Sequence, residues 1–252
     1  ASINYPLRGA VTWKSIVGTN VAADALSNLA SAGVIGGSLI VVGEDYGEGA
    51  SVIQERTHAF ALKSSIWLLD PRPELPTIVR MVEQGFALSE ASNTPVMLEL
   101  RIRACHVYGS FEASDNVASQ FSAKHRIPSP AMFEYDRLSH PPATFAQEKH
   151  KTEQRLPQAQ QFILEHKLNE IVGPEDGEVG IIVQGGLFNV LNGRLVLAGL
   201  SDAFGNMKVP TLVLNVTYPL VPEQIAKFCA GKKSVLIVEE GNPEFIEQAV
   251  GQ

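Results

Sequence analysis

An acidic, glycine-rich segment follows an apolar run near the start of the chain, and it is a place where ligand chemistry could occur. The run from Ser38 to Val42 predicts a buried strand, and the sequence after it reads Gly43-Glu44-Asp45-Tyr46-Gly47-Glu48-Gly49. Ligands of open α/β sheets bind beside the carboxyl ends of strands, so this loop is a candidate site. Its glycines lack the spacing of a G-x-G-x-x-G or P-loop motif, and a solvent-exposed turn is the alternative interpretation.

Charged side chains also lie at the ends of two other predicted strands. Arg101, Arg103 and His106 close the strand 96–102. Alternation along a strand puts Arg101 and Arg103 on one face, where both could reach an anionic ligand or form a salt-bridged interface. Glu239-Glu240 follows a strand at 233–238 and could do acid–base chemistry or cap the dipole of the next helix, and we favour capping.

No metal site is predicted. The two cysteines, Cys105 and Cys229, lie far apart without neighbours of ligand type. They therefore cannot form a zinc or iron–sulfur site within this chain. We expect both to be small buried apolar residues in a reducing compartment.

The elements that must position these residues alternate between strand and helix. In the first part of the chain the patterns predict strands at 10–17, 38–42, 65–69 and 94–100, and helices that start at Asn20 as the cap and that cover 52–62 and 77–89. Short connections and nearly all-apolar strands indicate a doubly wound, mostly parallel sheet covered on both faces.

The character changes after residue 111. Polar and proline-rich residues predominate from 112 to 177, with one helix expected at 157–171. Alternation resumes with strands at 179–183, 210–216 and 233–238, a helix opened by Pro222, and a last helix begun by Asn242-Pro243-Glu244 as cap, proline and first-turn acid. We therefore predict two α/β domains, 1–111 and 178–252, joined by a polar, proline-containing connector, 112–177.

Composition narrows the partners. The 252 residues carry a formal charge of -7, which disfavours nucleic acid and anionic membrane surfaces. No apolar run approaches the roughly 20 residues of a membrane-spanning helix, and no signal segment opens the sequence. A cytoplasmic location is expected.

A family resemblance covers nearly the whole chain. Gly18 to Asp24, 26–37 and the strand at 38–42 resemble the pyrimidine-binding domain of the indolepyruvate ferredoxin oxidoreductase alpha subunit, in the thiamine-diphosphate-dependent 2-oxoacid:ferredoxin oxidoreductase family. There an Asn-Val-Ala-Ala-Asp helix precedes an apolar strand and an acidic loop, as Asn20 to Asp24 and 44–47 do here. Segments 179–186, 217–220 and 238–247 resemble the family's transketolase-C-terminal-like domain.

The resemblance implies oxidative decarboxylation of a 2-oxoacid, such as indolepyruvate, to an acyl-CoA, with electrons passed to ferredoxin. The implied cofactors are thiamine diphosphate and Mg²⁺, bound jointly with residues outside this chain, and iron–sulfur clusters in a missing domain or partner. The family's opening segment with its cofactor-activating glutamate, its Gly-Asp-Gly diphosphate domain and its cysteine-rich domain are not matched here. We therefore expect a complementary diphosphate-binding domain or subunit, ferredoxin, and a homo- or hetero-oligomer as partners, and name no general base.

On this resemblance, the cofactor-facing rim is expected at Gly18, Asn20, Asp45 and Gly47. Arg103 and His106 are expected nearest a substrate carboxylate or a domain interface. In the loop after Asp45 the sequence only partly matches the family's Ser-Ser-Gln and Glu-Gln residues. Two hypotheses therefore stay open: a part of the catalytic enzyme, as a fragment or one chain of a split enzyme, or a non-catalytic binding or scaffold subunit on the same fold.

Overall fold

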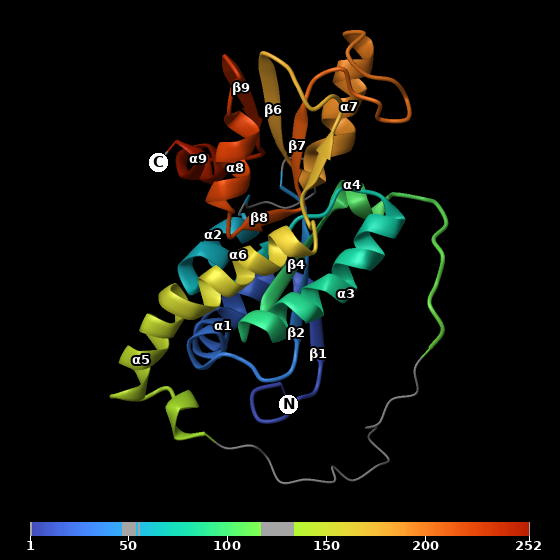
Figure 1. Cartoon of the computed structure of the whole chain (residues 1–252). Coiled ribbons are helices and arrows are strands. Elements are labelled where there is room, and N and C mark those ends of the chain that lie inside the picture. Colours follow the sequence, from blue (N-terminus) through green and yellow to red (C-terminus); the bar gives the residue numbers. More distant parts are fainter. Residues whose placement is uncertain (1, 47–53, 55, 117–133, 252) are drawn as a thin grey trace.

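Two β-sheets, one above the other in Figure 1, organise the chain in this computed structural model, which describes residues 2–46, 54, 56–116 and 134–251. The larger sheet has the order β1-β2-β4-β3-β8 and consists of β1 (Gly9–Lys14), β2 (Ser38–Glu44), β4 (Val96–Arg101), β3 (Trp67–Leu69) and β8 (Val216–Tyr218). The smaller sheet has the order β5-β7-β6-β9 and consists of β5 (Glu170–Val172), β7 (Thr211–Leu214), β6 (Val179–Gln184) and β9 (Ser234–Val238). All strand pairs are parallel except β3 with β8 and β5 with β7, so the predicted mostly parallel α/β fold is confirmed.

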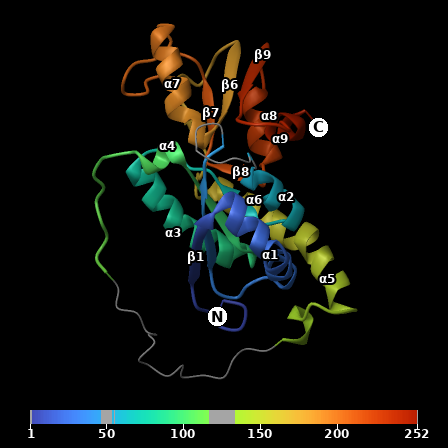
Figure 2. The same ribbon diagram turned by 180° about the vertical axis from the view of Figure 1, so that it is seen from behind.

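Helices cover both faces of the larger sheet, as Figures 1 and 2 show from opposite sides. Leu39, Leu69 and Leu98 pack with residues of α3 (Leu75–Ser92) and α6 (Leu156–Glu165). Their strand neighbours Ile40 and Met97 face the other way, onto α1 (Asn20–Ala32) and α2 (Thr57–Ser64). Because both faces are buried, each strand needs apolar residues at every position, and this explains the continuous apolar runs.

The smaller sheet is built by the same rule. On one face Ile181 and Val183 pack against α7 (Phe188–Leu197), which the single turn η4 (Gly185–Leu187) joins to β6. On the other face Ile182 packs with α8 (Pro222–Cys229) and α9 (Phe245–Val250). No helix in the described part of the chain is both long and apolar enough to span a membrane.

The connector contributes helix α6 to the cover of the larger sheet and strand β5 to the smaller sheet. It contains η2 (Tyr135–Arg137), then α5 (Ala143–His150), η3 (Lys151–Arg155) and α6 in succession. The side chain of Arg155, in η3, packs against α1, and its Nη1 donates to the carbonyl of Ala30 at 2.8 Å. The helix expected at 157–171 ends early, at Glu165, because Lys167 adopts a positive φ of 49° and the chain then enters β5. The domain boundaries at 111 and 178 stay predictions.

The prediction of a single strand at 210–216 is wrong. It is two strands, β7 and β8, which lie in different sheets on either side of Asn215. The buried Asn215 carboxamide donates to the Leu168 carbonyl at 2.9 Å and accepts from the Arg72 amide at 2.9 Å. These bonds hold the chain where it crosses from one sheet to the other.

The carboxyl ends of β1, β2 and β4 differ from the predicted ones. β1 stops at Lys14 and is followed by a π-helical turn, η1 (Ser15–Thr19), that runs directly into α1. Asn20 is therefore not a helix cap, and its Nδ2 donates to the Ile16 carbonyl at 2.7 Å instead. β2 extends to Glu44, whereas β4 ends at Arg101 and is followed by the short helix α4 (Ile102–Cys105). The expected burial of Cys105 is wrong, because this turn leaves it exposed; Cys229 is half-buried.

Candidate functional site

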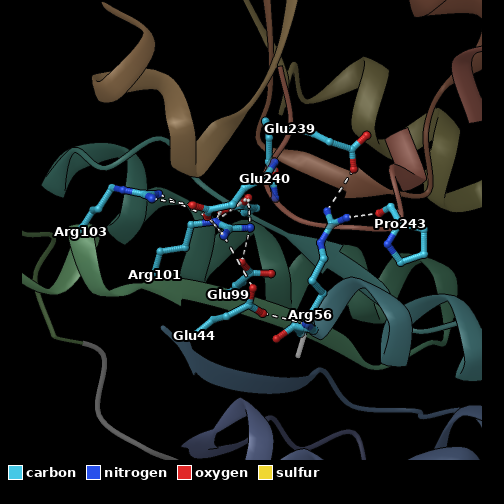
Figure 3. A network of polar contacts seen from close by, with 11 residues as sticks. Glu44, Arg56, Glu99, Arg101, Arg103, Glu239, Glu240 and Pro243 are labelled. Atoms are coloured by element: carbon cyan, nitrogen blue, oxygen red, sulfur yellow. Dashed lines mark hydrogen bonds and ion pairs between the residues drawn. The ribbon is translucent and has the colours of Figure 1, made fainter. Parts of the chain in front are cut away.

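The carboxyl ends of strands from both sheets face one another across a network of charged side chains, shown close up in Figure 3. The network includes Glu44, Asp70, Glu99, Arg101 and Arg103 from the larger sheet and the segments after its strands, and Glu239 and Glu240 directly after β9. Both sheets therefore direct the edge at which α/β proteins bind ligands toward the same place.

Arg101 is the centre of this network. Its Nη2 lies 2.6 Å from Glu99 Oε1, its Nε 3.3 Å from Asp70 Oδ2 and its Nη1 3.6 Å from Glu44 Oε1. The same Nη1 also bonds Glu240 Oε2, which belongs to the other sheet. The Arg101 side chain is only 4% exposed, so one buried cation holds carboxylates from both sheets.

A second arginine joins the sheets beside the first. Arg56 precedes α2, and its Nη2 lies 3.1 Å from Glu239 Oε1 while its Nη1 donates to the Pro243 carbonyl. The other Glu239 oxygen accepts from the Ile246 amide at 2.9 Å and the Glu247 amide at 2.8 Å. Capping of α9 is thus confirmed for Glu239, and the expectation that Asn242 caps this helix is wrong.

Burial and charge shift the proton equilibria of this cluster. Burial raises the pKa of Glu99 well above its ordinary value, and the nearby Glu44 and Asp70 carboxylates raise it further, although Arg101 opposes them. Burial likewise raises the pKa of Glu44 and of Asp70 against the opposing charge of Arg101. Burial alone would lower the pKa of Arg101, but the surrounding carboxylates outweigh it and raise that pKa. Three arginines facing five acids therefore favour a shared proton, for which Glu99 is the best holder.

A neutral histidine lies at one side of the network. His58 on α2 is 4% exposed, and its ring centroid lies 5.1 Å from that of Phe245. Burial, followed by the charges of Arg56 and Arg101, lowers the pKa of His58 to about 3. Its Nδ1 is buried and has no hydrogen-bond partner among the described residues, so this histidine packs as an uncharged ring.

The residues expected on the cofactor-facing rim lie at the ends of β1 and β2, beside the network. Gly18 is in η1, where a Cβ would come within 2.3 Å of the Trp13 ring. Asp45 follows β2 and pairs with Lys14 Nζ at 3.1 Å. Gly47 lies outside the described residues. The structure thus brings Gly18, Asn20 and Asp45 to one edge, and their role in cofactor binding stays a prediction.

Arg103 and His106, the two residues expected near a substrate or an interface, lie in different surroundings. Arg103 in α4 points toward the other sheet, and its Nη2 lies 2.6 Å from Glu240 Oε1. His106 is the exposed residue that ends α4. The β-alternation used to place Arg101 and Arg103 on one face does not apply, because the strand ends between them, yet both reach Glu240.

Sequence reasoning missed several members of the network. Arg56, Asp70 and Glu99 were not singled out, and Glu44 was named only as part of the acidic loop. For Arg101 and Arg103, the salt-bridged interface is the alternative that the structure shows. One signal could have found Glu99: it is a single charged residue inside the apolar strand 96–100. A charge in a strand covered on both faces must find a buried partner.

A small pocket lies between the ends of β2 and β4, where the family resemblance places the aminopyrimidine ring of the cofactor. It holds about 180 Å³ and is lined by Lys14, Gly43, Glu44, Asp45, Leu100, Ile102 and Cys105. Gly43, Leu100 and Ile102 can form one wall against a flat ring. Both nearby carboxylates are already engaged, Glu44 by Arg101 and the Thr57 amide and Asp45 by Lys14. Within the described ranges no three potential ligands gather to hold a metal ion. These residues thus fit part of a cofactor cleft but not a complete thiamine diphosphate site.

The two-sheet arrangement recurs in a solved structure. A 2-oxoglutarate:ferredoxin oxidoreductase from Magnetococcus marinus superimposes with a TM-score of 0.64 over 99% of this chain and 48% of that chain, at 16% sequence identity. This chain therefore has the α/β fold of the matched part of that structure. No family model matches the sequence.

Sequence relatives give a closer comparison. Indolepyruvate oxidoreductase subunit IorA from Pyrococcus abyssi is 30% identical over 240 residues, and that from Methanothermobacter thermautotrophicus is 28% identical over 235 residues. The matches cover 95% and 92% of this chain but only 36% and 35% of the relatives, so the chain spans about a third of their length. The resemblance to the indolepyruvate oxidoreductase alpha subunit is confirmed for that part of the subunit.

Proposed function

We propose that this chain is part of a thiamine-diphosphate-dependent 2-oxoacid:ferredoxin oxidoreductase of the indolepyruvate type. The main support is that similarity to subunits named IorA extends over more than nine-tenths of the chain. The position of Gly18, Asn20 and Asp45 at a carboxyl strand edge supports it further. The activity would convert an arylpyruvate and coenzyme A to an acyl-CoA and carbon dioxide in the cytoplasm, and would pass the two electrons released to ferredoxin.

In this proposal the chain supplies one wall of the cofactor cleft. The cofactor would supply the nucleophilic carbon that adds to the 2-oxo group. Gly43, Leu100 and Ile102 would pack against the flat ring and keep water from it, while the Arg101 network holds the strand ends in place. The activating glutamate, the Mg²⁺–diphosphate grip and the iron–sulfur clusters would come from residues outside this chain.

The test uses the assembled enzyme with its partner subunit. Thiamine diphosphate with Mg²⁺ is titrated calorimetrically, and reduction of ferredoxin is followed with indolepyruvate or 2-oxoglutarate in the presence of coenzyme A. Ile102→Trp would fill the pocket and is expected to weaken cofactor binding by about tenfold, whereas Val190→Trp on the exposed side of α7 should leave it unchanged. Absence of heat in the assembled enzyme would contradict the proposal.

A non-catalytic scaffold subunit is the second candidate. It is favoured by one observation: Glu44, Asp70, Glu99, Glu239 and Glu240 all pair with arginine, which is typical of a structural interface. In that case the assembly should form normally but bind no cofactor. Size-exclusion chromatography beside the titration separates the two candidates.

A further inference from the structure

A pocket on the smaller sheet, remote from the charged network, has the features of a ligand site. It holds about 540 Å³ and is lined by Leu164, Ile171, Gly173, Glu175, Glu223, Gln224, Lys227, Phe228 and Lys232. Gly173 packs against the Val209 carbonyl, just before β7, and Lys232 lies just before β9. The pocket therefore runs along the α8 side of the smaller sheet, from the amino ends of these two strands to Leu164 at the end of α6 and Glu223 at the start of α8, and Glu239 and Glu240 do not line it. Its volume is in the range of small-molecule sites.

The floor of this pocket is apolar. Phe228 is 5% exposed and belongs to the core under α8, and Leu164 at the end of α6 packs against the core of the larger sheet. Ile171 on the edge strand β5 is 56% exposed, so the part of the pocket wall that it forms is open to water. An apolar group entering the pocket would cover Ile171 and contact Leu164 and Phe228.

The rim carries four charged side chains of both signs that form no ion pair with any described residue: Glu175, Glu223, Lys227 and Lys232. Glu223 and Lys227 have the i, i+4 spacing that favours an ion pair on a helix, yet their side chains form no ion pair or hydrogen bond with any described residue. The same holds for Glu175. Lys232 lies over the Phe228 ring, with Nζ 4.6 Å from the centroid, and has no carboxylate partner among the described residues.

We propose that this pocket binds a free amino acid with an apolar side chain. A purely anionic ligand would meet Glu175 and Glu223, and a purely cationic one would meet Lys227 and Lys232, so a ligand with both charges is favoured. Its ammonium group pairs with a glutamate, its carboxylate pairs with a lysine, and its side chain covers Phe228 and Ile171. This site is independent of the proposed catalytic function, because no residue of the strand-end network contributes to it.

The test is calorimetric titration of the full chain, in complex with its partner subunit, with L-phenylalanine and L-leucine. Three probes each lack one feature: 3-phenylpropionate lacks the ammonium group, phenethylamine lacks the carboxylate and glycine lacks the side chain. Saturable heat is expected from both amino acids, and each analogue should bind about tenfold more weakly or not at all. No saturable heat from either amino acid, or equal affinity for an analogue lacking one charge, overturns the proposal.

Substitutions place the ligand in this pocket rather than elsewhere. Glu223→Gln and Lys227→Gln are exposed changes that preserve side-chain size, and each should weaken L-phenylalanine binding by about tenfold. The matched controls are Glu178→Gln and Lys233→Gln, an ion pair outside the pocket in which both side chains are 73% exposed. Unchanged binding in the two pocket variants, or an equal loss in the two controls, overturns the assignment.

Discussion

At the scale of single residues, Arg101 neutralises the largest number of buried carboxylates in the described network, because acids from both sheets contact its guanidinium. Removing one member of a buried ion cluster leaves its partners desolvated and unpaired, which costs more than the pair contributes in net stability. Substituting a single member of the network should therefore change the free energy of unfolding by a measurable amount, even if the intact network contributes little net stability.

Arg101→Met is expected to lower the free energy of unfolding by about 3–5 kcal/mol, because Glu99, Asp70 and Glu44 lose their buried counter-charge. The measurement is urea unfolding followed by circular dichroism. Arg8→Met is the control: Arg8 pairs with Glu90 at the surface, where it is 54% exposed, and about 0–1 kcal/mol is expected. An Arg101 variant no less stable than the Arg8 variant would contradict the role of the network.

Glu99 should make stability depend on pH. Its pKa in the folded protein is raised well above the ordinary 4.5, so its contribution is fully present below pH 4.5 and is lost as pH rises through the folded pKa. Glu99→Gln, which stays neutral, should therefore gain stability relative to wild type as pH rises above 4.5, as measured by urea unfolding.

A second glutamate supplies a control of opposite sign. The hydrogen bond from Arg8 lowers the pKa of Glu90, so the stability due to Glu90 is present above pH 4.5 and is lost on acidification. Glu90→Gln should therefore show no gain relative to wild type as pH rises. If Glu99→Gln behaves in the same way, Glu99 does not hold the proton.

At the scale of elements, the close turn between β1 and α1 depends on a glycine. A Cβ at Gly18 would lie within 2.3 Å of the Trp13 ring, whose Nε1 donates to Thr19 at 3.1 Å. The space next to Gly18 is thus filled by the side chain that closes the turn. The family-like motif at Gly18 to Asp24 therefore has a packing role, whether or not it binds a cofactor.

Gly18→Ala should destabilise the protein by about 1–3 kcal/mol, because Trp13 must move to accommodate the new methyl group. Gly193→Ala in α7 is the matched substitution: no atom lies within 4 Å of its Cβ position, and about 0.4–1 kcal/mol of added stability is expected. Differential scanning calorimetry compares the two. Equal effects of both substitutions would show that Trp13 does not restrict the turn.

At the scale of the whole molecule, the two sheets are joined by polar contacts and by the crossing of the chain at Asn215. Gly185 and Gly186 allow the close approach, since a Cβ at Gly186 would come within 2.5 Å of Arg101 Cδ and of Asp70 Oδ1. Glu240 then connects Arg101 and Arg103 to the other sheet. These ion pairs and close contacts therefore fix the carboxyl ends of the strands of one sheet relative to those of the other, across the candidate site.

Glu240→Gln is expected to loosen this junction locally. It removes the negative charge that Arg101 and Arg103 share, so amide exchange in α4 and at the end of β9 should accelerate by about tenfold. Exchange in α5, which is far from the junction in both views of the ribbon, should not change. Hydrogen–deuterium exchange with mass spectrometry measures both regions. A uniform change across the chain would indicate global destabilisation instead.

Local pattern in the sequence was sufficient for most of the fold. The apolar runs at 38–42, 65–69 and 94–100 predicted buried strands, and the pattern at 77–89 predicted the helix α3. These signals depend on neighbours within a few residues. The helix cap predicted at the acidic pair after β9 is confirmed for Glu239 for the same reason, whereas Glu240 pairs with Arg101 and Arg103 instead. Family-like motifs also indicated the relatives that the comparisons confirm.

The charged network required the tertiary structure. Arg101 and Glu240 lie 139 positions apart, and Arg56 and Glu239 lie 183 apart, so no local pattern indicates that they meet. The split of 210–216 between two sheets has the same origin, since Asn215 is held by carbonyl and amide groups of other segments. Local sequence determines which residues prefer strand or helix, whereas the pairing of buried charges depends on how two sheets pack.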